Sequence, residues 1–206
     1  MDILDILERE YPDVKGTALK HSSALELLVA TILSAQTTDR RVNVVTEKLF
    51  SRYRTAEDFA NADIEELMEM IRSVNYYKTK AKHIKEGCRI IIEEYGGNVP
   101  DSMEELVKLP GVQRKTANVV LSNAFGKEEG IAVDTHVMRV SQRLGITEES
   151  AREKIERDLM NKFPGNRWSD VSNLLIAHGR RVCRARNPEC EKCILKDMCR
   201  HYKNMA

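Results

Sequence analysis

The chain has 206 residues, 42% of them hydrophobic, enough to fill the core of one large domain or of two small ones. Its 33 Lys and Arg nearly balance its 32 Asp and Glu, so the net charge of +1 indicates no partner by itself. No stretch approaches the roughly 18 consecutive apolar residues of a membrane span, and the acidic start lacks an apolar signal core. We therefore expect a cytoplasmic protein without a membrane segment, and nothing in the sequence suggests an oligomer.

Charge is unevenly distributed along the chain. Residues 1–16 hold five acidic and two basic side chains, whereas residues 178–206 hold eight basic and three acidic ones. The basic end is a candidate phosphate-binding face. A solvated basic tail is the alternative interpretation.

Apolar residues at helical spacing predict helices in nearly every segment. In the first half of the chain we expect helices over residues 2–11, over 23–33, after Asp39, after the capping residues Thr55 and Asp63, and through 81–92 to Gly96. The 23–33 segment opens on a serine cap and is apolar on almost all sides, so it should be a buried central helix. Residues 75–78 are a turn candidate.

The second half continues in the same way. We expect a helix from Ser102 into Leu109, one over 114–125, one from Asp134 or Thr135 to Gly145, one from a Thr147 cap to Pro164, and a last one beginning near Trp168. No segment has a convincing alternating pattern. The sequence therefore predicts an all-α fold.

Residues 109–113, Leu-Pro-Gly-Val-Gln, leave a very short turn between two of these helices. The N-terminus of the second helix presents backbone N–H groups and a positive dipole end, which suit an anion such as a nucleic-acid phosphate. A plain packing contact between the two helices is the alternative.

Lys115 follows this turn, and Asp134 opens the next helix nineteen residues later. An amine that attacks carbon and a carboxylate that manages proton and charge are the components of imine chemistry. Alone, Lys115 is more often a solvated surface charge and Asp134 a simple helix cap. His136, close by, is more often structural.

Four cysteines crowd into residues 183–199 with the spacing Cys183-x6-Cys190-x2-Cys193-x5-Cys199. In a reducing compartment such a group suggests a metal site. Structural zinc usually takes two Cys-x2-Cys pairs; one pair flanked by single cysteines favours a [4Fe–4S] cluster, with zinc as the alternative.

Together these residues resemble the endonuclease III family of helix–hairpin–helix DNA glycosylases, over nearly the whole chain. The 109–120 stretch is similar to the family's hairpin and catalytic lysine, residues 133–136 to its catalytic aspartate segment, and the cysteines to its [4Fe–4S] loop. Residues 34–37, Ser-Ala-Gln-Thr, resemble the loop whose glutamine enters the emptied base stack. The resemblance implies two helical domains, a six-helix barrel over residues 17–128 and a cluster domain made of 1–16 and 129–206, with the active cleft between them.

The resemblance also implies a bifunctional DNA glycosylase and abasic-site lyase that removes oxidised pyrimidines such as thymine glycol from double-stranded DNA, associated with the nucleoid. Lys115 and Asp134 would be catalytic. The residues expected to contact DNA are Gln36, Tyr76, Gly111, Gln113, Arg114, Arg184 and Arg186. The alternatives are a monofunctional mismatch or alkylated-base glycosylase and a non-catalytic iron–sulfur DNA-binding protein.

Two positions depart from the family pattern. The family usually has a second glycine where this chain has Gln113, so any need for positive φ would strain the hairpin. A leucine wedge is common where this chain has Tyr76, whose ring could stack against the orphan base.

Overall fold

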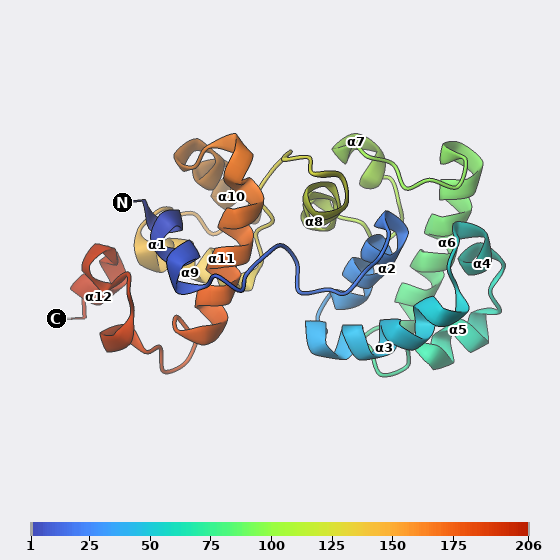
Figure 1. Cartoon of the computed structure of the whole chain (residues 1–206), viewed down its shortest axis with the longest axis horizontal. Coiled ribbons are helices and arrows are strands. Elements are labelled where there is room, and N and C mark those ends of the chain that lie inside the picture. The colour runs from blue at the N-terminus through green and yellow to red at the C-terminus, as the bar shows by residue number, and fades with distance from the viewer. Residues whose placement is uncertain (1, 206) are drawn as a thin grey trace. The chain divides into compact units, whose positions relative to one another are not determined.

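The structure is a computed structural model that describes residues 2–205, and it divides into two compact units. One unit is Thr17–Lys127, and the other combines Met1–Gly16 with Glu128–Ala206. Residues 2–205 contain helices, turns and loops but no β-strand, which confirms the all-α prediction (Figure 1). Over the same range no helix has both the length and the apolar character needed to cross a membrane.

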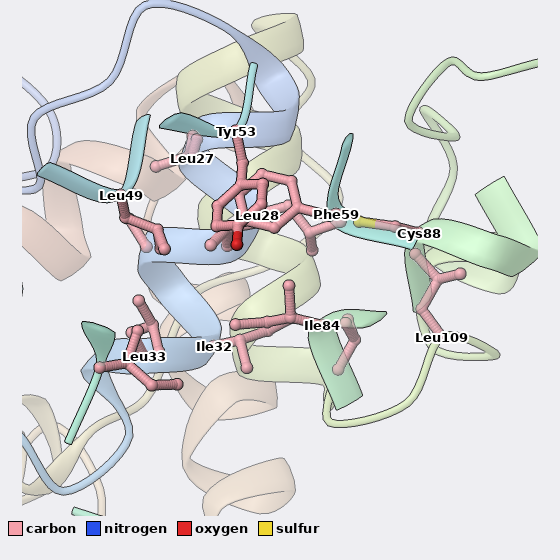
Figure 2. Close-up of a cluster of buried hydrophobic side chains, with 14 of the residues drawn as sticks. Leu27, Leu28, Ile32, Leu33, Leu49, Tyr53, Phe59, Ile84, Cys88 and Leu109 are labelled. Atoms are coloured by element: carbon pink, nitrogen blue, oxygen red, sulfur yellow. The ribbon is translucent and has the colours of Figure 1, made fainter. Parts of the chain in front are cut away.

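The Thr17–Lys127 unit is built around a buried helix. Its helices are α2 (Ala24–Ser34), α3 (Asp39–Arg52), α4 (Ala56–Asn61), α5 (Ile64–Met70), α6 (Tyr77–Tyr95), α7 (Met103–Leu106) and α8 (Arg114–Phe125). Helix α2 packs against α3, α6 and α8, and its residues from Leu27 to Leu33 are all buried. Figure 2 shows how Leu28 and Ile32 of α2 face Phe59 and Ile84 from neighbouring helices.

Local capping sets most helix ends in this unit. Ser23 Oγ accepts the Glu26 N–H at the start of α2, at 3.2 Å. Thr55 and Asp58 form a reciprocal capping box at α4, as their spacing predicts. Gly126 ends α8 in the left-handed conformation that glycine adopts readily.

Two expected boundaries in this unit are wrong. The turn expected over residues 75–78 lies earlier, over residues 71–76, because α5 ends at Met70 and Tyr77 already begins α6. The helix expected from Ser102 to Leu109 ends at Leu106. Pro110 disfavours helical backbone at Leu109, so the helix does not run into the proline. The chain instead reaches the hairpin through a tight turn in which Leu109 N–H donates to Leu106 O at 3.1 Å.

The second unit joins the N-terminal helix to the last third of the chain. Its elements are α1 (Ile3–Glu10), α9 (Thr135–Leu144), α10 (Arg152–Lys162), η1 (Gly165–Arg167), α11 (Trp168–Arg181), η2 (Cys190–Lys192), η3 (Lys196–Met198) and α12 (Arg200–Lys203). Helix α11 packs against both α1 and α9. The core between them is made of Leu4, Leu7, Val137, Val140, Leu174 and Leu175.

Thr147 does not cap the helix that follows it, contrary to expectation. Helix α10 begins at Arg152, behind Ala151. The buried Thr147 hydroxyl instead donates to Asp158 Oδ2 at 2.5 Å and accepts the Glu149 N–H at 3.1 Å. Its capping chemistry therefore holds the preceding loop against the side of α10.

Candidate active site

The turn between α7 and α8 depends on Gly111, whose φ is 77°. Val112 N–H closes the turn on Leu109 O at 3.1 Å, and both side chains are buried in the core. A Cβ atom at residue 111 would lie 2.6 Å from Nδ1 of His83. Glycine is therefore needed both for its left-handed backbone and for the close approach of His83.

Gln113 is the N-cap of α8 and has extended backbone, with φ −101° and ψ 169°. Any residue adopts that conformation, so the strain considered for this position is not present. Ala117 N–H donates the first helical bond, to Gln113 O at 3.0 Å. The amides before Ala117 lie at the positive end of α8, where an anion is stabilised.

Lys115 is exposed in the first turn of α8. Ala117 and Asn118, two and three residues on, are buried and hold this turn of the helix against the core. The exposed amine is thus carried by a rigid element just beyond the hairpin. A ligand whose phosphate bound at the hairpin turn would therefore lie on the same part of the surface as the Lys115 amine.

Asp134 is the N-cap of α9. Its Oδ1 accepts the N–H groups of His136 at 2.8 Å and Val137 at 2.9 Å. Both bonds end on the same oxygen, so the cap holds the carboxylate in place through one of its two oxygens. Lys115 belongs to the Thr17–Lys127 unit and Asp134 to the other.

Gln36 and Tyr76 are brought together although forty residues separate them. Both have left-handed backbone, with φ of 56° and 57°, and both are exposed. Asn75 Nδ2 donates to Gln36 O at 2.5 Å, and Asn75 N–H donates to Thr37 Oγ1 at 3.3 Å. The two segments expected to enter the duplex therefore lie side by side.

The four clustered cysteines line one cavity of the second unit (Cys183, Cys190, Cys193, Cys199). Among residues 2–205, no three side chains of His, Cys, Asp or Glu converge at the spacing of ligands around one metal ion. In a [4Fe–4S] cluster each thiolate binds a different iron, so the thiolates surround a cavity rather than meet at a point. Four thiols around a cavity fit that cofactor.

Burial raises the pKa of the Cys190 and Cys193 thiols, and the neighbouring Cys183 and Cys199 raise it further. Four thiolates held this close repel one another and lose hydration. Iron would supply the positive charge that stabilises them, so the four thiols would lose their protons when they bind a cluster.

Arg143 ties the cysteine loop to α9. Its Nη1 lies 3.4 Å from Cys183 Sγ and donates to Arg184 O at 2.8 Å, while Nη2 donates to Ala185 O at 3.3 Å. The loop is therefore held by side-chain contacts as well as by its cysteines. Arg184 and Arg186 are both exposed on this loop, and Arg184 also forms an ion pair with Glu189.

His178 connects the cysteines to the N-terminal helix. Its Nε2 lies 3.5 Å from Cys193 Sγ, and its Nδ1 lies 2.8 Å from the Tyr11 hydroxyl. Burial raises the pKa of Tyr11 to about 12, so this hydroxyl keeps its proton. When Tyr11 donates to Nδ1, the neutral imidazole carries its own proton on Nε2, facing the sulfur.

Sequence reasoning missed four residues that support the site: Asn75, Lys80, Arg143 and His178. One signal was available. Lys80 shares the apolar stripe of α6 with Ile84 and Cys88, and a lysine on such a stripe is buried or directed to a specific acceptor. The partners of Asn75 and Arg143 lie 39 and 41 positions away, too far for a local pattern to show them. His178 lies 15 positions before Cys193, but no motif links the two.

Comparison with known proteins identifies the family. Residues 29–165 match the model of the HhH-GPD superfamily base excision DNA repair protein, and residues 183–199 match the iron-sulfur binding domain of endonuclease III. Endonuclease III of Synechocystis sp. is 51% identical over 198 residues, which cover 96% of this chain and 90% of that protein. Endonuclease III of Bacillus subtilis is 51% identical over 184 residues, covering 88% and 83%.

Solved structures agree. The structure of a trapped endonuclease III–DNA covalent intermediate is 45% identical with a TM-score of 0.93, covering 98% of this chain and 94% of that one. The structure of a thermostable thymine-DNA glycosylase is 26% identical with a TM-score of 0.86, covering 98% and 95%. The chain therefore belongs to the endonuclease III family, the DNA glycosylases and abasic-site lyases of base excision repair, and its cofactor is a [4Fe–4S] cluster.

Proposed function

We propose that this enzyme removes oxidised pyrimidines such as thymine glycol from double-stranded DNA and nicks abasic sites through a Schiff base on Lys115. The observation that carries the proposal is the exposed Lys115 amine on a rigid helix start beside the hairpin. A relative that is 45% identical has been trapped as a covalent intermediate with DNA, which supports an enzyme-bound nucleophile here.

The reaction begins with extrusion of the damaged nucleotide, at a cost of a few kcal/mol that is smallest for damaged bases. The neutral Lys115 amine attacks C1′, the C1′–N bond breaks, and the base leaves with the bonding electrons and a proton. The nitrogen then forms an imine with C1′ as the sugar ring opens. Loss of a C2′ proton expels the 3′ phosphate by β-elimination, and water releases the sugar fragment from the lysine.

Asp134 complements the amine. Its carboxylate stabilises the positive charge that develops on the sugar as the base departs and assists proton transfer. The cap bonds from His136 and Val137 fix this carboxylate before substrate arrives, so little reorganisation is needed during the reaction.

Different residues contact the DNA backbone and the gap that the extruded base leaves in the base stack. We propose that Gly111, Gln113 and Arg114 bind phosphate at the positive end of α8. Gln36 and Tyr76 enter the duplex, where Tyr76 stacks against the orphan base. The exposed Arg184 and Arg186 contact a further phosphate from the cysteine loop.

We propose that Cys183, Cys190, Cys193 and Cys199 each bind one iron of the cluster. The cluster then shapes the loop that carries the two arginines. We propose that the enzyme acts as a monomer. Its proposed substrate, double-stranded DNA with a damaged base or an abasic site, is DNA of the nucleoid in the cytoplasm.

Borohydride trapping on an abasic-site duplex tests the nucleophile. Borohydride reduces the imine, so the wild-type enzyme should become attached to DNA and the Lys115→Ala variant should not. Lys82→Ala removes another exposed lysine of the same unit and should trap like wild type. Absence of an adduct with wild type, or an adduct that survives Lys115→Ala, would contradict the lyase mechanism.

A second candidate is a mismatch glycosylase, which the likeness to the thermostable thymine-DNA glycosylase favours. A panel of duplexes, each with one lesion or mismatch, separates the two. The first proposal expects cleavage at thymine glycol and none at a thymine opposite guanine, and the reverse result supports the second.

A further inference from the structure

Two exposed residues of the Thr17–Lys127 unit, Gln36 and Tyr76, hold a backbone conformation that non-glycine residues rarely adopt. Strain of this kind costs about 1–3 kcal/mol for each residue and persists only where surrounding contacts impose it. The contacts that impose it here are therefore informative, and they come from Asn75 and Lys80.

Lys80 reaches the loop of Gln36 from inside the protein. It is 5% exposed, and its Nζ donates to Leu33 O at 2.8 Å and to Ala35 O at 2.5 Å. The Ala35 carbonyl belongs to the peptide bond that leads into Gln36. The amine thus fixes the backbone immediately before the strained residue.

The same residue also fixes Tyr76. The backbone N–H of Lys80 donates to Tyr76 O at 3.0 Å, which is the first helical bond of α6. Lys80 therefore connects both strained residues, one through its side chain and one through its main chain. Asn75 adds a second link on the surface by donating to Gln36 O.

The surroundings of the Lys80 amine favour a positive charge although the side chain is buried. Both acceptors of the amine are main-chain carbonyls at the C-terminal end of α2, where the helix dipole is negative. Burial still lowers the pKa of Lys80 to about 8. An apolar side chain would avoid that burial penalty but would leave the Leu33 and Ala35 carbonyls without these donors.

We propose that Lys80 is a positioning residue that locks Gln36 and Tyr76 into one preformed pair, ready to enter the duplex together. The proposal rests on the proposed function of those two residues in DNA binding. A pair ordered before binding loses less conformational entropy when it inserts, so insertion and base extrusion are favoured.

The test uses holoenzyme and a duplex in which 2-aminopurine stands opposite a tetrahydrofuran abasic analogue. The 2-aminopurine is the orphan base, and its fluorescence depends on how well it is stacked. At saturating protein all of the duplex is bound, so the fluorescence reports stacking independently of binding affinity. Wild type should change the fluorescence, and Lys80→Met should give less than half of that change. Lys85→Met is the matched control, because Lys85 lies on the same helix and its Nζ donates to a different carbonyl, Ala62 O, at 2.5 Å.

A second variant does not depend on a buried residue. Asn75 is exposed, and Asn75→Ala should reduce the fluorescence change in the same direction. Lys80→Met should also lower the single-turnover glycosylase rate about tenfold, the rate equivalent of one or two lost hydrogen bonds. Lys85→Met should match wild type in both measurements.

The results distinguish a failure of the proposed role of Lys80 from a failure of the proposed insertion of Gln36 and Tyr76. No fluorescence change with wild type would overturn the insertion of Gln36 and Tyr76, and the inference with it. A wild-type change that Lys80→Met and Asn75→Ala both retain would overturn the inference alone. A loss shared equally by Lys85→Met would reduce the effect to general destabilisation and overturn it as well.

Discussion

His83 lies so close to Gly111 that a methyl group on the glycine would stand 2.6 Å from the imidazole Nδ1. The helix–hairpin–helix turn is therefore constrained by a side chain of α6 as well as by its own backbone. This contact distinguishes Gly111 from the other left-handed glycines of its unit.

Gly111→Ala should destabilise the protein more than Gly126→Ala. Both residues have positive φ, but a Cβ atom at Gly126 meets nothing within 4 Å. Gly126→Ala should cost about 1 kcal/mol for the left-handed backbone, and Gly111→Ala about 1–3 kcal/mol more for the clash with His83. Urea unfolding measures both. Equal losses would show that His83 does not constrain the turn, and His83→Ala should relieve part of the Gly111→Ala loss.

Asp134→Asn should separate catalysis from capping. Asparagine caps helices as well as aspartate does, so the free energy of unfolding should change by only a few tenths of a kcal/mol. The single-turnover glycosylase rate should fall by about a hundredfold or more, because the negative charge is lost. Asp63→Asn makes the same change at the N-cap of α5 and should leave the rate unaltered. A wild-type rate in Asp134→Asn would make Asp134 a cap alone.

His178→Phe should shift the reduction potential of the cluster to more negative values. The variant removes the N–H that faces Cys193 Sγ, and a thiolate that loses a hydrogen bond stabilises oxidised iron more strongly. A bond of about 1 kcal/mol corresponds to about 40 mV for a one-electron couple.

Film voltammetry of the DNA-bound holoenzyme measures the shift, and retained cluster absorbance is the control for assembly. Tyr11→Phe should produce a smaller shift, since Tyr11 acts only through the imidazole. An unchanged potential in His178→Phe would mean that the 3.5 Å contact carries no hydrogen bond.

Lys80 should make stability rise with pH above about 8. Burial lowers its pKa to about 8 from a reference of 10.5, so between those values the unfolded chain binds more protons than the folded one. The contribution of Lys80 to the free energy of unfolding should therefore grow by about 1 kcal/mol per pH unit in that range. Urea unfolding of wild type and Lys80→Met from pH 7 to pH 10 isolates it. A wild-type-minus-variant difference that stays constant would contradict the burial effect.

Local chemistry explains what could be predicted from the sequence. Ser23, the Thr55–Asp58 box, Asp134 and Gly145 act within four residues of the helix ends they determine, so their spacing alone locates those ends. The cysteine spacing is likewise local, and the endonuclease III iron–sulfur match confirms its interpretation.

The remainder depends on contacts between distant residues. Lys80 binds the carbonyl of Ala35, 45 positions away, and Arg143 binds the carbonyl of Arg184, 41 positions away. Thr147 carries the right group for a cap, but Asp158 competes for its hydroxyl once α10 is packed. Such competition is decided by tertiary structure: Thr147 and Asp158 are only 11 positions apart, but their spacing does not show which group the Thr147 hydroxyl will bind.

The burial of Cys88 makes this cysteine chemically different from the four clustered cysteines. Its thiol is buried in the core of the Thr17–Lys127 unit (Figure 2), and burial raises its pKa to about 12. A thiol that stays protonated and covered is a poor nucleophile and a poor partner for iron. In the folded chain the buried thiol of Cys88 is therefore shielded from iron and from disulfide exchange. A native thiol titration of the protein without its cluster should therefore leave Cys88 unreacted.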